Sequence, residues 1–249
     1  MPKFFVKQEQ IENEEIKIIG QDVNHIKNVL RLEAGDNISI CDKETAKSYN
    51  CSISQIEKDL VICKKLEEIL ESSEANTYIH IFQGLPKADK LEFIIEKCTE
   101  IGVKEITPVI MKRTIVRLDD KDKIKKISRW RKIAEVAAKQ SGRDKILKVN
   151  DIINFENIFE KFKEYDIVLI AYENEKNNTL KNALKKINKE KENLSIAVLI
   201  GPEGGIDNSE IELLKTNSKF DIITLGKRIL RTETAPLVVS SNILYEMEE

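Results

Sequence analysis

The sequence LSIAVLIGPEGG, residues 194–205, indicates the class of fold. Its apolar first part is typical of a strand buried on both faces of a parallel sheet, because half-exposed strands alternate apolar and polar residues. A glycine-rich loop ends this strand, and the next segment, NSEIELLK at 208–215, has the pattern of a helix. Asp207 and Glu210 have the spacing of a capping box at its start. A strand, a loop and a helix in this order indicate an α/β domain.

The same alternation of strands and helices continues on both sides of this stretch. Further strands are expected at YIHIF (78–82), EITPVI (105–110), DIVLIAY (166–172) and DIITL (221–225). Further helices are expected at residues 90–101, 121–141, 156–162, 180–190 and 235–248, the first of them stopped by Gly102. This pattern predicts an α/β domain with a mainly parallel sheet.

The first 72 residues have a different pattern of short strands rich in β-branched and aromatic residues. These strands are expected at KFFV (3–6), EIKIIG (15–20), NISICD (37–42), SYNCSISQIE (48–57) and LVICKKL (60–66), with one helical pattern at 22–32. The acidic, serine-containing stretch EEILESSEANT, residues 67–77, separates the two patterns. We therefore expect two domains, a small β-barrel-like domain at 1–72 and an α/β domain at 73–249.

Composition excludes several classes of protein. The chain has 249 residues and a net charge of −2, so nucleic acid would have to bind a local patch and not a uniformly basic surface. No apolar run approaches the ~20 residues that span a bilayer, and the N-terminus lacks the apolar core of a signal peptide. The four cysteines form no CxxC pair and only two histidines accompany them, which argues against a metal site. We expect a cytoplasmic protein that binds neither metal nor membrane.

Three loops follow predicted strands at the sheet edge where α/β folds bind ligands. They are IAYENE (170–175), IGPEGGID (200–207) and LGKRILRTETAP (225–236). Glycines let a ligand approach the backbone closely, although a tight structural turn would also explain the second loop. Neither a GxGxxG fingerprint nor a P-loop is present, which disfavours a nucleotide-phosphate site. In the third loop Thr234 and Pro236 suit a helix start, but the charged side chains before them require either solvent or a ligand.

Taken together, the motifs IGPEGG and LGKRILRTETA resemble the cofactor motifs of SPOUT-type RNA methyltransferases, most closely those of the RsmE family. That family methylates N3 of a uridine in small-subunit (16S) ribosomal RNA. The resemblance extends to HIKNVLRLEAGD (25–36), KLEFIIEKCTEIGV (90–103) and RWRKIAEVAAKQSGR (129–143). One departure is that RDKILKV stands where the family commonly has a proline shortly after the QSGR element.

The resemblance implies a C-terminal SPOUT α/β trefoil-knot domain, an N-terminal PUA-like β-barrel domain, a homodimer and S-adenosylmethionine as cofactor. It also implies which residues bind that cofactor, with adenine in an apolar slot that offers backbone hydrogen bonds. These residues are Ala171, Tyr172, Glu173, Ile200, Gly201, Pro202, Glu203, Gly204, Gly205, Leu225, Gly226, Ile229, Leu230, Arg231, Thr234 and Ala235.

Methylation of uracil N3 sets requirements for the catalytic residues, because N3 carries a proton and is a poor nucleophile until that proton leaves. Arg231 is our candidate for the cation that stabilises the uracil anion, and Glu203 and Glu233 are candidates for handling the proton or orienting Arg231. The alternative is that Arg231 pairs with Glu233 for structural reasons alone.

The expected partner is ribosomal RNA, within the small ribosomal subunit. The residues expected to contact it are His25, Lys27 and Arg31 in the first domain and Arg113, Arg117 and Arg143 in the second. Two alternatives are a non-catalytic RNA-binding protein with the same fold and a SPOUT methyltransferase that acts on another RNA. An α/β hydrolase-like enzyme ranks last, because no GxSxG elbow is present.

Overall fold

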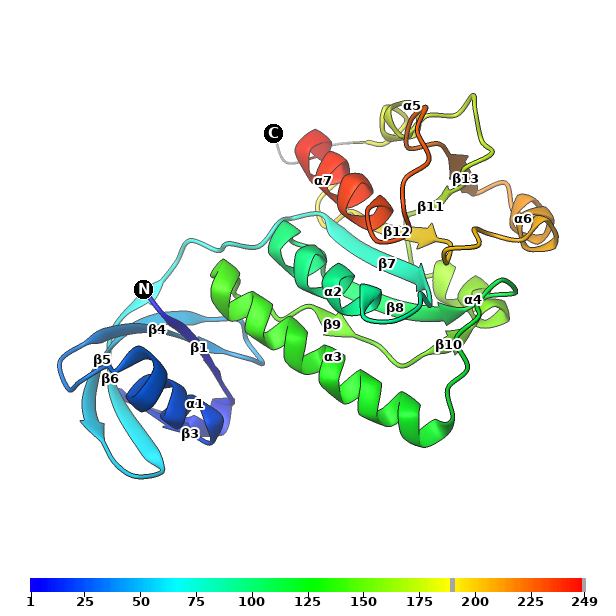
Figure 1. Cartoon of the computed structure of the whole chain (residues 1–249). Helices are drawn as coiled ribbons and strands as arrows, with labels where there is room; N and C mark the ends of the chain where they lie inside the picture. The colour runs from blue at the N-terminus through cyan, green and yellow to red at the C-terminus, as the bar shows by residue number, and fades with distance from the viewer. Residues whose placement is uncertain (189–190, 248–249) are drawn as a thin grey trace. The chain divides into compact units, whose positions relative to one another are not determined.

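The chain consists of two compact units in the computed structural model, which describes residues 1–188 and 191–247 (Figure 1). The first unit comprises Met1–Glu74 together with Ala138–Ile146. The second comprises Ala75–Ala137 and the described residues from Leu147 onward. The segment 138–146, which the sequence pattern places in the second domain, therefore packs with the first unit.

The first unit is built on a six-stranded mixed sheet in the order β1-β4-β5-β6-β3-β2. Its strands are β1 (Lys3–Val6), β2 (Ile11–Glu12), β3 (Glu15–Ile19), β4 (Asn37–Asp42), β5 (Ser48–Ile56) and β6 (Leu60–Ile69), with a 3-10 turn, η1 (Gln8–Gln10), before β2. β1 pairs with β4 in parallel, and all other neighbouring strands in this sheet are antiparallel. The five strands expected from the sequence are confirmed, and the two-residue β2 was too short to be predicted.

One helical segment covers the core of this sheet. It begins as α1 (Gln21–Asn24) and continues as a π-helical turn, η2 (His25–Leu30). Val23 and Ile26 point from it into a core that includes Phe4 and Ile16. Arg31 ends the segment with φ 54°, a left-handed conformation that stops the helix.

A buried polar cluster ties the segment 138–146 to the rest of the first unit. Asp144 accepts hydrogen bonds from the Ser48 hydroxyl at 2.6 Å and from the Ser73 amide at 2.8 Å, and it pairs with the Lys3 ammonium. Burial alone would raise the pKa of Asp144, but these donors outweigh it and lower that pKa to about 2. Asp144 is therefore an ionised hub within the unit.

The second unit is built on a seven-stranded sheet, and all neighbouring strands among its described residues are parallel. The order is β10-β8-β7-β12-β11-β13, with β9 paired to β8. The strands are β7 (Tyr78–Gly84), β8 (Glu105–Ile110), β9 (Lys148–Val149), β10 (Ile153–Asn154), β11 (Ile167–Ala171), β12 (Ser195–Ile200) and β13 (Phe220–Ile223). The expected parallel sheet is confirmed, and only the two-residue strands β9 and β10 were not predicted.

Helices cover both faces of this sheet. They are α2 (Lys90–Ile101), α3 (Asp120–Ser141), α4 (Ile158–Phe162), α5 (Leu180–Leu184), α6 (Asn208–Lys215) and α7 (Ala235–Met247), with the 3-10 turn η3 (Phe155–Asn157) before α4. Apolar side chains of α4 and α6 pack with alternate residues of the strands, such as Phe82 and Leu199. α2 and α7 pack against each other on the opposite face, in front of β7 in Figure 1.

The local signals in the sequence account for where these helices begin and end. Gly102 follows α2 with φ 113°, which glycine adopts without strain. Asp207 and Glu210 form the expected capping box of α6. The helix expected at 180–190 is shorter than predicted, because α5 ends at Leu184, and its last two residues lie outside the described part.

The parallel arrangement fixes where a site can form. β7, β12, β11 and β13 are consecutive neighbours, so their carboxyl ends and the loops after them meet at one edge of the sheet. Across residues 1–188 and 191–247, no helix has the length and apolar character needed to cross a bilayer.

Candidate functional site

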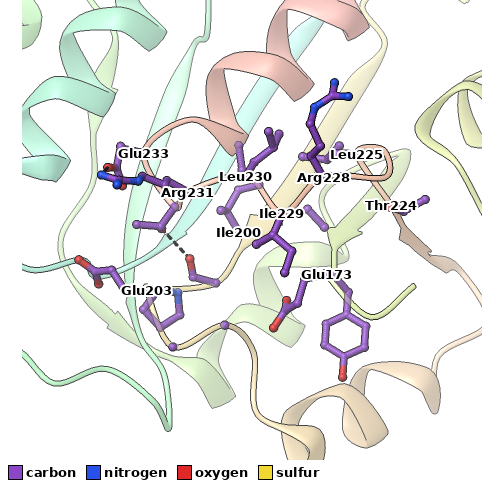
Figure 2. A pocket seen from close by; sticks show the side chains of 18 of the residues that line it. Glu173, Ile200, Glu203, Thr224, Leu225, Arg228, Ile229, Leu230, Arg231 and Glu233 are labelled. Atoms are coloured by element: carbon purple, nitrogen blue, oxygen red, sulfur yellow. Dashed lines mark hydrogen bonds and ion pairs between the residues drawn. The ribbon is translucent and has the colours of Figure 1, made fainter. Parts of the chain in front are cut away.

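A pocket of about 470 Å³ lies at this edge, where the loops after β11, β12 and β13 converge (Figure 2). Its volume falls within the range of small-molecule sites. It is lined by Lys90, Ala171–Glu173, Ile200–Gly205, Thr224–Glu233 and Ala235.

Nearly all residues expected from the sequence to bind the cofactor line this one pocket. The exception is Thr234, which stands between two lining residues but does not itself line the pocket. The pocket also contains Lys90, Thr224, Lys227, Arg228 and Thr232, which were not among the predicted site residues. Of these, Lys90 is the one that lies far in sequence from the three predicted loops, so no local motif could have indicated it.

The loop after β12 is held against the end of β7 by a close backbone approach. A Cβ atom added to Gly84 would lie 2.5 Å from the backbone nitrogen of Pro202, so only glycine fits at this position. The buried amide of Gln83 donates to the Thr232 hydroxyl at 2.9 Å, and that hydroxyl donates to the carbonyl of Gly201 at 2.8 Å. β7 therefore connects the loop after β12 to the segment before α7.

Gly205 lets a carboxylate approach the same loop. It adopts φ 71°, and a Cβ atom there would lie 2.2 Å from Oε1 of Glu173. The Glu173 carboxylate thus lies directly against the glycine loop, on the side of the pocket that also carries Ile229 in Figure 2. This arrangement explains why the loop requires glycine and not merely a turn-forming residue.

Arg113 supports the glycine loop from outside. Its guanidinium donates to the carbonyl of Gly204 at 2.9 Å and to the Asp207 carboxylate at 3.2 Å. Asp207 also caps α6 by accepting a hydrogen bond from the amide of Ser209. Arg113, expected from the sequence to contact RNA, is thus already engaged in holding this loop, although its side chain is 40% exposed.

The segment between β13 and α7 provides the apolar wall. Ile229 is 83% exposed, unusually so for a large apolar side chain that lines a pocket. Leu225, Leu230 and Ile200 add apolar surface beside it. Such a wall suits a flat aromatic group, which would remove the Ile229 side chain from water.

Charged side chains gather at the other side of the pocket, where Figure 2 shows Glu203, Arg231 and Glu233. Lys90 contacts both carboxylates, with its Nζ 3.1 Å from Glu203 and 3.3 Å from Glu233. Arg231 is 83% exposed, and its closest contact with Glu233 is 3.9 Å. The pair of Arg231 and Glu233 is therefore loose, so the arginine is available to a ligand.

The pocket has the chemical groups that S-adenosylmethionine would require. Three carboxylates, on Glu173, Glu203 and Glu233, can face cationic groups such as a sulfonium or an ammonium. The apolar wall can hold an adenine ring, and the glycine backbone offers hydrogen-bonding groups. Among the described residues, no cluster of three or more histidine, cysteine, aspartate or glutamate side chains has metal-binding geometry.

The residues of the first unit expected to contact RNA lie in or beside its helical segment. His25 is half-buried with its ring edge toward Phe4, and Lys27 donates to the carbonyl of Glu57 at 2.8 Å. Arg31 is exposed at the end of η2. In the second unit, Arg117 is exposed in the connection between β8 and α3.

Arg143 is buried, unlike the other arginines expected to contact RNA. Its side chain is 5% exposed and pairs with Glu74 at 2.7 Å, and Glu74 is buried as well. A second guanidinium nitrogen donates to the same carboxylate at 3.1 Å. The two-point ion pair already occupies the guanidinium, which argues against the contact with phosphate that the sequence predicts.

Comparisons with known proteins agree in both units. The family of RNA methyltransferase domains matches residues 73–244, and the family of RNA methyltransferase PUA domains matches residues 18–66. The chain is 37% identical to the ribosomal RNA small subunit methyltransferase E of Bacillus subtilis, covering 100% of this chain and 98% of that protein. The Mesomycoplasma hyopneumoniae protein of the same name is 34% identical and is covered over its full length.

A solved structure extends the comparison to the fold. The ribosomal RNA small subunit methyltransferase E from Neisseria gonorrhoeae, in a crystal structure bound to S-adenosyl methionine, matches with a TM-score of 0.85. It is 30% identical, and the match covers 98% of this chain and 97% of that one.

Proposed function

We propose that this chain, which belongs to the family of RNA methyltransferases that includes the ribosomal RNA small subunit methyltransferases E, transfers a methyl group from S-adenosylmethionine to small-subunit ribosomal RNA. The observation that carries the proposal is the convergence of the loops after β11, β12 and β13 on one pocket, in a chain that matches these relatives over its whole length. We propose N3 of a uridine as the acceptor, in keeping with the resemblance of the loop motifs.

Each side of the pocket would then have a defined task. When bound, S-adenosylmethionine supplies an electrophilic methyl group on a positively charged sulfur. Ile229 and Leu230 would cover the adenine, and Glu173 beside Gly205 would accept hydrogen bonds from the cofactor. The closed glycine loop would exclude water and hold the reacting groups in line.

The charged side of the pocket would act on the uracil. Arg231 is exposed and only loosely paired, so it can approach the base and stabilise the anion that forms when N3 loses its proton. Glu203 and Glu233 lie on the same side and are candidates for taking that proton or for orienting Arg231. Lys227 and Arg228 at the rim would contact RNA phosphate.

The finer features of the fold belong to the same proposal. β13 is an edge strand of the sheet, whereas α7, the next helix in the chain, packs against α2 and against β7 in the middle of the sheet. The segment that joins β13 to α7 must therefore run back from the edge of the sheet to its middle. This path supports a trefoil knot. We further propose that the first unit is a PUA-like barrel that binds RNA through His25, Lys27 and Arg31, that the protein is a homodimer and that it acts in the cytoplasm, where ribosomal RNA is modified.

Two measurements test the proposed function against its alternatives. Titration calorimetry should show that S-adenosylmethionine binds the protein, whereas a non-catalytic RNA-binding protein would bind RNA alone. Transfer of a labelled methyl group should then occur to small-subunit ribosomal RNA and not to large-subunit or transfer RNA. Cofactor binding with transfer to another RNA would replace the substrate, and absence of cofactor binding would reject the enzyme.

A further inference from the structure

Among the described residues that line the pocket, Lys90 alone comes from outside the loops after β11, β12 and β13 and the element ends that flank them, since it is the first residue of α2. Its Nζ lies 3.1 Å from Oε1 of Glu203, in the loop after β12. The same nitrogen lies 3.3 Å from Oε2 of Glu233, in the segment before α7. One ammonium group therefore connects two carboxylates that belong to different loops.

The other contacts of these carboxylates show how much depends on Lys90. Oε1 of Glu203 also accepts a hydrogen bond from the backbone amide of Lys87 at 3.0 Å, so Glu203 has one partner in the connection between β7 and α2 and another at the start of α2. Oε2 of Glu233 is buried and accepts no hydrogen bond from any described residue, so its ion pair with the Lys90 ammonium compensates its charge. Arg231 approaches the other oxygen of Glu233 only to 3.9 Å.

We propose that Lys90 is a positioning residue, which holds Glu203 and Glu233 in one arrangement on the side of the pocket where the RNA base reacts. This inference rests on the proposed function, because it assigns Lys90 a part in methyl transfer. Two carboxylates that face the same space repel each other, and without a cation between them one would move away or take up a proton. Arg231 would then lose the carboxylate that orients it.

The electrostatics of the site agree with this geometry. The hydrogen bond to Glu203 is the main reason that the pKa of Lys90 is raised, so the ammonium stays charged. Burial opposes ionisation of Glu203, but its backbone hydrogen bonds and Lys90 together lower the pKa of Glu203 below its ordinary value. The charged groups that face Lys90 are thus Glu203 and Glu233, with Arg231 behind Glu233.

The same helix offers a matched control. Lys97 also lies on α2 and also contacts two carboxylates, with its Nζ 2.8 Å from Glu96 and 2.7 Å from Glu100. Its side chain is 33% exposed, as is that of Lys90, but it does not line the pocket. Lys97→Met therefore removes the same charge and the same number of ion pairs without touching the site.

Single-turnover methyl transfer should distinguish the two lysines. In Lys90→Met we expect the rate to fall between about 10- and 100-fold, as for a misplaced catalytic group, while the Kd of S-adenosylmethionine changes less than about threefold. The acid limb of the pH–rate profile should move to higher pH, because the carboxylates lose their cation. Lys90→Arg should restore most of the rate, and Lys97→Met should behave as wild type.

A second readout does not depend on activity. Carbon NMR of side-chain carboxyls in ¹³C-glutamate-labelled protein, assigned with Glu203→Gln, should show that the Glu203 carboxyl titrates at higher pH in Lys90→Met. If the titration and the rate were both unchanged in Lys90→Met, the proposal would be overturned. Unfolding of Lys90→Met while Lys97→Met stays folded would also overturn it, since the role of Lys90 would then be structural. If wild-type protein methylates no RNA, the proposed function fails, but the titration still decides the role of Lys90.

Discussion

Arg231 is the residue on which the proposed chemistry depends most. It is 83% exposed beside a carboxylate that it barely reaches, which is a poor arrangement for stability, because exposed ion pairs contribute roughly 0–1 kcal/mol. The same arrangement leaves the guanidinium available to a base. The alternative, a structural pair of Arg231 with Glu233, would require a closer contact than 3.9 Å.

We therefore predict that Arg231→Ala lowers the rate of methyl transfer by about 100- to 1000-fold, the usual loss when a group that stabilises a developing anion is removed. Cofactor binding and thermal stability should change little. Arg131→Ala, which removes another exposed arginine with a single carboxylate partner, serves as the control in the same single-turnover assay. Full activity in Arg231→Ala would assign the residue a role outside catalysis.

For Arg143 we predict an effect on stability, because its charge is buried. Removing one partner of a buried ion pair leaves the other without compensation, which costs about 3–5 kcal/mol. Arg143→Ala should lower the free energy of unfolding in urea by that amount, whereas Lys163→Ala, in an exposed pair with Glu160, should change it by less than about 0.5 kcal/mol. Weaker RNA binding by Arg143→Ala with unchanged stability would restore the RNA contact predicted from the sequence.

At the scale of elements, the end of β7 connects the sheet to the pocket. Gly84 lies so close to Pro202 that a methyl group cannot be accommodated without moving backbone, and Gln83 beside it holds Thr232. β7 thus positions the loop after β12 and the segment before α7, although it provides no lining residue of its own.

Gly84→Ala should therefore weaken S-adenosylmethionine binding by at least about tenfold, because the loop must shift away from its bound position. Gly204→Ala is the matched control within the same loop. A Cβ atom there would meet the Arg113 side chain at 3.1 Å, which can yield slightly, and the Arg113 carbonyl oxygen only at an ordinary contact distance of 3.6 Å. Equal calorimetric affinities for the two variants would show that the contact between β7 and the loop does not shape the pocket.

A buried histidine near the amino end of β7 should make the stability of the protein depend on pH. His80 on β7 is 2% exposed, stacks on Phe82 at 4.1 Å and hydrogen bonds with Thr107 and Tyr165. Burial lowers the pKa of His80 to about 3, although Glu105 acts in the opposite direction. The folded protein therefore resists protonation of His80 through a range in which the unfolded chain accepts the proton.

The sign of the effect follows from this difference. His80 in the unfolded state binds a proton below about pH 6.5, so stability present above that value is lost as the pH falls toward 3, by at most about 1.4 kcal/mol per pH unit. Urea unfolding at pH 7.5 and pH 5.0 should show a smaller loss of stability for His80→Gln than for wild type. An identical loss in both proteins would mean that other groups cause the acid sensitivity.

At the scale of the whole molecule, local patterns predicted most elements but not their long-range contacts. The strand at 105–110 could be predicted from the alternation of strands and helices. The end of α2 could be predicted from Gly102, the glycine that follows it and adopts a left-handed conformation. Lys90 joins the pocket only because the parallel sheet brings the start of α2 beside two loops that follow it by more than a hundred residues. The ion pair of Arg143 could not be predicted for the same reason, since its partner Glu74 is distant in sequence.

The two units also divide the proposed function between them. The second holds the pocket, and the first matches a PUA domain and carries four of the six residues expected to bind RNA, namely His25, Lys27, Arg31 and Arg143. No local motif indicates the buried hydrogen bonds of Asp144 with Ser48 and Ser73. These bonds show that part of the connection after α3 helps to hold the first unit together. We therefore expect RNA to contact the exposed Arg31 and Arg117, and not the buried Arg143.

The most direct test of the central claim is nucleoside mass spectrometry of small-subunit ribosomal RNA from cells with and without this protein. We predict that N3-methyluridine is present in the RNA of wild-type cells, absent after deletion and restored by the intact gene but not by the Arg231→Ala variant. An undiminished amount of N3-methyluridine in the RNA of the deletion strain would contradict the proposed function.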